Sequence, residues 1–262
     1  MSASINTRMD NPFLVQLISG TIIGLGAGYL GAFMVLRRMS LVGDALSHVA
    51  LPGIAVALLF GINPFLGAFA ALLLGITGVW LLEKNTTLPS ETLVGIFFTV
   101  SLALGILLTP QPELLEALFG DIANVTSSDM LISGALVVAM FIIMVFISRG
   151  IVLGTISKDL AQSAGIKLGR NNYLFLLLVA VIVALGLKVA GTLLMGSLVI
   201  IPAAAAKNIS QNLSSYTKLS ALFGAIASFI GIYFAGWLGL PAGAIVVLSA
   251  GAVFLVTLPF KR

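Results

Sequence analysis

Nine blocks of apolar residues, most of them about twenty residues long, run through the chain. They cover residues 13–36, 41–62, 65–82, 92–109, 129–148, 172–190, 192–206, 217–238 and 241–258. A helix of about 20 residues crosses the roughly 30 Å hydrocarbon core of a bilayer and satisfies its own backbone hydrogen bonds there. Only 8% of the 262 residues are charged, whereas 60% are hydrophobic, so the chain lacks the charges for a water-facing surface. The sequence therefore predicts an all-α, multi-pass transmembrane bundle that forms one domain over residues 1–262.

The seventh block, residues 192–206, is short for a full crossing and contains Pro202. A proline removes a helical hydrogen bond, and broken helices at membrane depth are tolerated where they are buried in protein. Two descriptions follow. The chain has either nine spans, or eight full spans and one short or re-entrant element.

The basic residues of the loops predict the orientation of the bundle. Eleven of the 13 Lys and Arg residues follow odd-numbered blocks, namely Arg37, Arg38, Lys84, Arg149, Lys158, Lys167, Arg170, Lys207, Lys218, Lys261 and Arg262. The other two, Arg8 and Lys188, fall on the opposite side. Cytoplasmic loops collect such residues, so we expect an N-terminus outside and a C-terminus in the cytoplasm. The net charge of +4 has the same explanation, and no nucleic-acid partner is expected.

The chain offers little that an enzyme would use. It has no cysteine and one histidine, and its scattered serines form no convincing pair of nucleophile and base. It also lacks the G-x-x-x-x-G-K-[ST] loop that cradles nucleotide phosphates. Any energy from ATP must therefore come from a partner chain, and no cofactor is expected on this one.

The second block contains the pattern Asp44-Ala45-Leu46-Ser47-His48. Residues four apart project from one face of a helix, so this carboxylate and the single histidine share a face. A carboxylate inside a membrane is costly, and Asp with His is a plausible ligand pair for a divalent transition metal. A two-fold homodimer would supply two such pairs, and Pro52 and Gly53 would break the helix just beyond them. The alternative is that Asp44 caps the helix at the interface and His48 is a core residue.

A polar stretch follows the fifth block. Ser157 suits a helix N-cap, Asp159 suits the first turn, and Gly165 suits the left-handed residue that ends a helix. We therefore predict a short amphipathic helix at about 157–168. It either docks into a groove on a cytoplasmic partner or lies on anionic lipid.

An acidic loop, residues 112–121, follows the fourth block on the opposite side. Its carboxylates, Glu113, Glu116 and Asp121, either attract cations and bind a basic partner, or form a plain solvated loop.

Five segments together resemble the permease subunits of ABC-type zinc and manganese importers, over about residues 24–259. Residues 37–48, which read R-R-M-S-L-V-G-D-A-L-S-H, are similar to that family's R-R-M-x-x-x-G-D-A-x-x-H signature. Four further segments resemble family motifs in the same order, namely residues 119–122, 156–161, 165–167 and 198–204.

The resemblance implies several partners and roles. They are a homodimer in the bacterial inner membrane, a cytoplasmic dimer of ABC ATPases, and an extracytoplasmic metal-binding protein that delivers the ion. It implies that Asp44 and His48 lie on the metal path. It also implies that residues 157–168, with Ser157, Lys158, Asp159, Leu160, Ala161 and Gly165, form the helix that contacts the ATPase. The stretch 157–161 is more similar to the zinc branch than to the D-P-x-H-A form of manganese permeases, which favours Zn²⁺ over Mn²⁺.

Two other transport functions remain open. A siderophore or corrinoid permease of the same architecture is generally longer, with an extra span. A secondary carrier driven by ions or protons would use Asp44 as its proton site, but it has no evident use for a docking helix.

Overall fold

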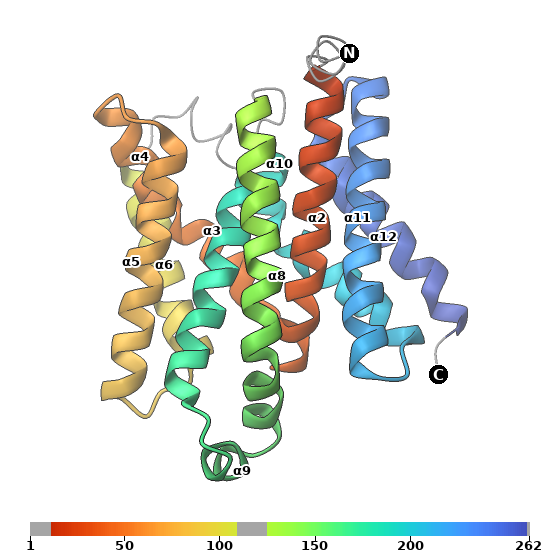
Figure 1. Cartoon of the computed structure of the whole chain (residues 1–262). Helices are drawn as coiled ribbons and strands as arrows, with labels where there is room; N and C mark the ends of the chain where they lie inside the picture. Colours follow the sequence, from red (N-terminus) through yellow and green to blue (C-terminus); the bar gives the residue numbers. More distant parts are fainter. Residues whose placement is uncertain (1–11, 109–124, 261–262) are drawn as a thin grey trace, which may run out of the picture.

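The computed structural model describes residues 12–108 and 125–260 and, within them, contains helices and no strand. The helices are α2 (Pro12–Leu36), α3 (Val42–Val49), α4 (Leu51–Leu59), α5 (Pro64–Asn85), α6 (Ser90–Leu108), α8 (Ser127–Ile156), α9 (Lys158–Ser163), α10 (Leu168–Ile209), α11 (Leu213–Leu238) and α12 (Ala242–Thr257), with a 3₁₀ turn at Leu258–Phe260. Figure 1 shows them as a bundle of roughly parallel and antiparallel rods.

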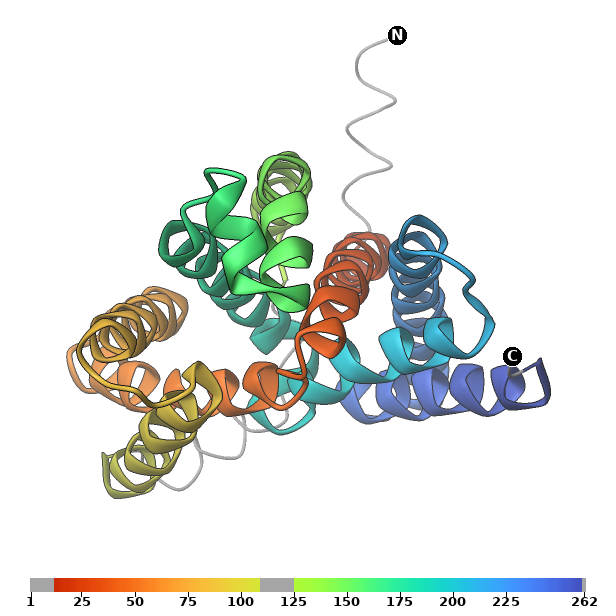
Figure 2. The ribbon, with the colours of Figure 1, turned by 90° about the horizontal axis from the view of Figure 1, so that it is seen from below.

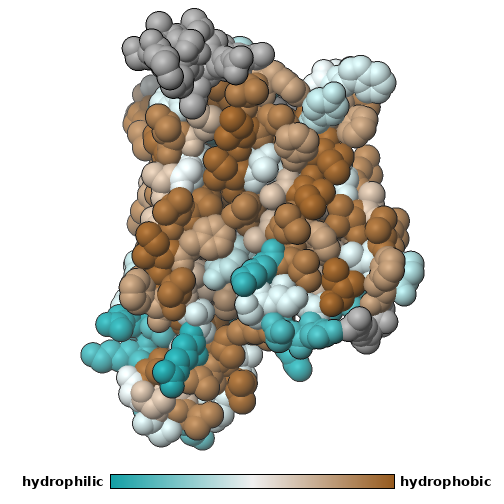
Figure 3. Space-filling model, turned by 45° about the vertical axis from the view of Figure 1, so that its right-hand side comes forward, coloured by the Kyte–Doolittle hydropathy of each residue, from teal (hydrophilic) through white to brown (hydrophobic). Residues whose placement is uncertain are grey.

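The predicted all-α transmembrane bundle is confirmed. Among the described residues, eight helical stretches are long and apolar enough to cross a membrane, and Met195–Ile209 is a shorter apolar helix. Of the two descriptions that the sequence allowed, the structure therefore agrees with eight full spans and one short element. On the face shown in Figure 3, hydrophobic side chains cover the middle of the molecule and hydrophilic ones gather toward its lower end.

The span at Val42–Leu59 consists of two helices, α3 and α4, which meet at Ala50. Pro52 lies in the first turn of α4, where its missing N–H is tolerated. The break expected beyond the Asp44–His48 pair is therefore present. It precedes Pro52, because a proline begins a helix more easily than it continues one.

The expected break in the seventh block lies at Gly191 and not at Pro202, which sits inside a helix. Gly191 has φ 68° and ψ −178°, a conformation that only glycine adopts readily. The chain there turns from the first half of α10 into its second half. Met195 of the second half lies directly over Gly186 of the first, where a side chain would collide with its sulfur.

Helices α2 and α11 pack with their backbones close together. A Cβ added at Gly24 would collide with Ser228 and Gly224, and one at Gly28 would collide with the backbone of Ser220. Small residues permit this close approach in lipid, where no hydrophobic effect drives helices together.

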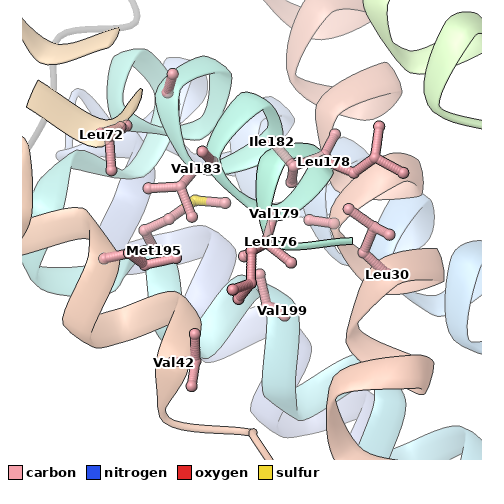
Figure 4. Close-up of a cluster of buried hydrophobic side chains, with 14 of the residues drawn as sticks. Leu30, Val42, Leu72, Leu176, Leu178, Val179, Ile182, Val183, Met195 and Val199 are labelled. Carbon is pink, nitrogen blue, oxygen red and sulfur yellow. The ribbon is translucent and has the colours of Figure 1, made fainter. Parts of the chain in front are cut away.

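The core of the bundle lies around α10. Side chains from α2, α3 and α5 meet both halves of α10 in a buried cluster, which Figure 4 shows around Leu30, Val42, Leu72, Val183 and Met195. Seen from below, α3, the second half of α10 and α12 follow one another along one side of the molecule (Figure 2). The broken helix is therefore the element against which the Asp44–His48 helix packs.

A candidate cation site at a broken helix

Asp44 and His48 both lie on the eight-residue helix α3, one turn apart. The side chain of Asp44 packs against Gly196 in the second half of α10, where an added Cβ would lie 2.5 Å from the Asp44 Cβ. His48 is 8% exposed, and its ring centroid lies 5.3 Å from that of Phe98 in α6. The structure thus places the predicted pair together, between α6 and α10.

The Nδ1 atom of His48 is buried and has no hydrogen-bond partner. An imidazole binds a transition metal through the lone pair of one ring nitrogen. The Nδ1 atom of His48 has no competing hydrogen bond, so it is the nitrogen that we take as open to a cation. Neutral imidazole is the form that binds transition metals.

A hydrogen bond from Ser47 connects α3 to the break in α10. Its hydroxyl lies 2.7 Å from the carbonyl oxygen of Thr192 and 2.6 Å from that of Asp44, both at donor distance. Sequence reasoning did not single out Thr192. The signal was present in the glycine at residue 191, between a full-length block and a short one.

In one copy of the chain the site has few ligands of the usual metal-binding types. No group of three or more His, Cys, Asp or Glu side chains that could hold a metal occurs among the described residues. Asp44 and His48 therefore give two ligands, and the remaining ligands must come from water, backbone, hydroxyl groups or another chain.

The polar helix predicted at about 157–168 is present but shorter, as α9 (Lys158–Ser163). The Leu160 N–H donates to the Ser157 side chain at 3.3 Å, so Ser157 is the N-cap, as predicted. The helix ends at Ser163, earlier than predicted, and Gly165 with φ 75° is the left-handed residue of the turn that follows. Ala161 is buried against the bundle, whereas Leu160 is 51% exposed. α9 extends beyond the lower end of the bundle in Figure 1.

A buried polar network next to α9 joins the ends of four helices. Arg37, just after α2, donates to the side-chain oxygen of Asn172 at 2.7 Å, and the Asn172 amide donates to Glu83 of α5 at 2.6 Å. Ser90 of α6 donates to the other Glu83 oxygen at 2.7 Å. Burial lowers the pKa of Arg37, an effect that the charge of Glu83 partly offsets. Sequence reasoning assigned no role to Glu83 or Asn172, because their contact partners are distant in the chain.

At the opposite end of the bundle, Lys188 of α10 pairs with Asp129 of α8 at 2.6 Å. Asp129 also closes a capping box with Thr126 at the start of α8. Lys188, which departs from the positive-inside pattern, is thus neutralised. The acidic loop with Glu113, Glu116 and Asp121 lies outside the described residues.

The fold defines a multi-pass membrane protein. Residues 9–261 match the model of the ABC 3 transport family, so the chain belongs to that family of ABC transport permeases.

Three known proteins illustrate the relationship. The chain is 34% identical over 245 residues to the manganese import system permease protein ScaB of Streptococcus parasanguinis, covering 92% of this chain and 88% of the relative. It is 31% identical to the high-affinity zinc uptake system membrane protein ZnuB of Haemophilus influenzae, covering 94% and 96%. The solved structure of PsaBC from Streptococcus pneumoniae in complex with Fab has a chain with a TM-score of 0.82 and 32% identity, covering 98% of this chain and 95% of that one.

Proposed function

We propose that this chain carries a divalent transition metal ion, Zn²⁺ or Mn²⁺, through the membrane past Asp44 and His48. The observation that carries the proposal is the placement of the pair. A carboxylate and an imidazole share one face of a short helix inside a membrane span, against a broken helix. Ion sites in transporters are frequently built at such breaks. Relatives named for manganese and for zinc support both cargoes.

The proposed transporter has two copies of this chain. Two copies related by a two-fold axis near α3 would supply two carboxylates and two imidazoles, enough for a four-coordinate ion. A dimer of ABC ATPases supplies the energy from the cytoplasm, and an extracytoplasmic binding protein delivers the ion. The acidic loop of residues 112–121 is the proposed docking region for that protein.

Helix α9 is the proposed contact with the ATPase. Its six residues stand between two non-helical residues, and an exposed leucine, Leu160, projects from a polar end of the molecule. Force applied to α9 reaches α8 and α10, which flank it in the chain. The second half of α10 holds α3 through Ser47, so a rotation about Gly191 would move the cation pair between outward and inward access.

The test is uptake of radioactive ⁶⁵Zn²⁺ and ⁵⁴Mn²⁺ by the complete transporter in proteoliposomes. We expect Asp44→Asn and His48→Gln to reduce uptake of the transported ion at least about a hundredfold, since each removes a ligand at each of two symmetric positions. Assembly with the ATPase should be unchanged. Glu91→Gln, which neutralises an exposed carboxylate at the start of α6, is the matched control and should transport normally. Normal uptake by both site variants would rule out this metal path.

A further inference from the structure

Thr192 presents a buried polar atom that the proposed path does not use. Its side chain is 0% exposed, and its hydroxyl oxygen has no hydrogen-bond partner. A threonine in a helix ordinarily donates to a carbonyl one turn earlier, but at this position the chain has just left the helix at Gly191. An unpartnered buried hydroxyl destabilises the fold, so its presence needs a reason.

The neighbours of Thr192 indicate that reason. The Thr192 carbonyl oxygen lies 2.7 Å from the hydroxyl of Ser47, and Ser47 lies between Asp44 and His48 on α3. His48 Nδ1 is a second buried atom without a partner in the same region. Helix α3 and residue 192, which this hydrogen bond joins, therefore carry two polar atoms without partners, a carboxylate and a carbonyl oxygen. Such a collection is expected where an ion is held during part of a cycle.

We propose that Thr192 is an oxygen ligand of the cation site and that it shifts the preference of the site from Zn²⁺ toward Mn²⁺. This inference rests on the proposed function of Asp44 and His48. A neutral hydroxyl or carbonyl oxygen is a hard ligand that suits Mn²⁺, whereas Zn²⁺ prefers four ligands rich in nitrogen and sulfur. Ser47 is the positioning residue, because its hydrogen bond fixes the distance between α3 and residue 192.

Thr192→Val separates this role from a structural one. Valine has the same shape and lacks the hydroxyl. Since that hydroxyl has no partner, a purely structural Thr192 would be replaced at no cost or with a gain in stability. We expect the variant to fold normally, and its KM for Mn²⁺ uptake to rise about tenfold, equivalent to about 1.4 kcal/mol. Its KM for Zn²⁺ should change less than about threefold.

Two further variants test the chemistry of the ligand. Thr192→Ser keeps the hydroxyl and should restore Mn²⁺ uptake. Thr192→Cys exchanges a hard oxygen for a soft sulfur in a chain that has no other cysteine, and it should turn the preference toward Zn²⁺. The matched control is Thr217→Val. Thr217 is a buried threonine of α11 whose hydroxyl donates to the Ser214 carbonyl, and its replacement should leave the ratio of the two KM values unchanged.

The outcomes distinguish this inference from the proposed function. If the ratio of the KM values for Mn²⁺ and Zn²⁺ is unchanged in both Thr192→Val and Thr192→Cys, Thr192 is not a ligand. The proposed metal path still holds in that case if Asp44→Asn loses uptake. Normal uptake in Asp44→Asn and His48→Gln overturns the path itself. If Thr192→Val does not assemble, the ratio measured for Thr192→Cys against Thr192→Ser decides the question.

Discussion

Arg37 and Glu83 are connected by a neutral side chain, that of Asn172. Asn172, which is 8% exposed, lies between Arg37 and Glu83 and bonds to both. The guanidinium and the carboxylate thus share an amide in place of a direct ion pair. Arg37 is partly buried, burial lowers its pKa, and its Nη1 atom is buried without a hydrogen-bond partner, so the guanidinium depends on this link to Glu83.

Removing the charge of Glu83 should therefore destabilise the end of the bundle that carries α9. We expect Glu83→Gln to lower the free energy of unfolding by about 1–3 kcal/mol, because Arg37 then keeps its charge with less compensation. The measurement is thermal unfolding of the purified protein in detergent. Glu91→Gln, on an exposed surface, should change stability by less than about 0.5 kcal/mol. Equal stability of the two variants would show that the network contributes nothing.

Among the helices, α9 differs most from its surroundings, since it is short, polar and extends beyond the bundle. Leu160 is 51% exposed on it, so it is the large apolar side chain that α9 would present to the proposed ATPase partner. We expect Leu160→Ala to weaken binding of the ATPase about tenfold, as truncation of an interface anchor does. The affinity can be measured with the permease in nanodiscs. Leu240→Ala is the control, because Leu240 is 49% exposed and follows α11 at the opposite end. If Leu160→Ala and Leu240→Ala bind the ATPase with equal affinity, α9 is not part of the interface.

The lengths of apolar blocks were sufficient to predict the elements, but not the contacts between them. Length and composition place the spans because each must cross the same hydrocarbon thickness. The Asp44–His48 pair was also predictable, since both residues lie on one helix and their spacing sets their shared face. Thr192 was not, because it approaches α3 across 145 residues of sequence through a backbone carbonyl, which no residue type signals. The break was assigned to Pro202 on the same reasoning, whereas glycine's positive φ at position 191 produces the sharper turn.

For the whole molecule, the two ends of the bundle differ in charge. The described cations lie mostly at the end that carries α9: two follow α2, others lie in the last turns of α5 and α10, and others lie in α9 and around the first turn of α10. Lys188, at the other end, is paired with Asp129. Helix α2 begins at one end of the bundle and α12 ends at the other, which requires an odd number of passes (Figure 1). Eight long spans and the shorter helix Met195–Ile209 together give nine. Both observations fit the positive-inside expectation, and they make the orientation testable in a single chain.

We expect the end that carries α9 to face the cytoplasm. The chain has no cysteine, so one introduced thiol is a unique label. In right-side-out vesicles, a membrane-impermeant maleimide should label Ile62→Cys, in the turn between α4 and α5, because Ile62 is 52% exposed at the opposite end. Ser163→Cys, at the exposed end of α9, should react only after the vesicles are opened. The reverse labelling pattern would place α9 outside the cell, where no cytoplasmic ATPase can reach it. That result would contradict both the proposed orientation and the proposed contact between α9 and the ATPase.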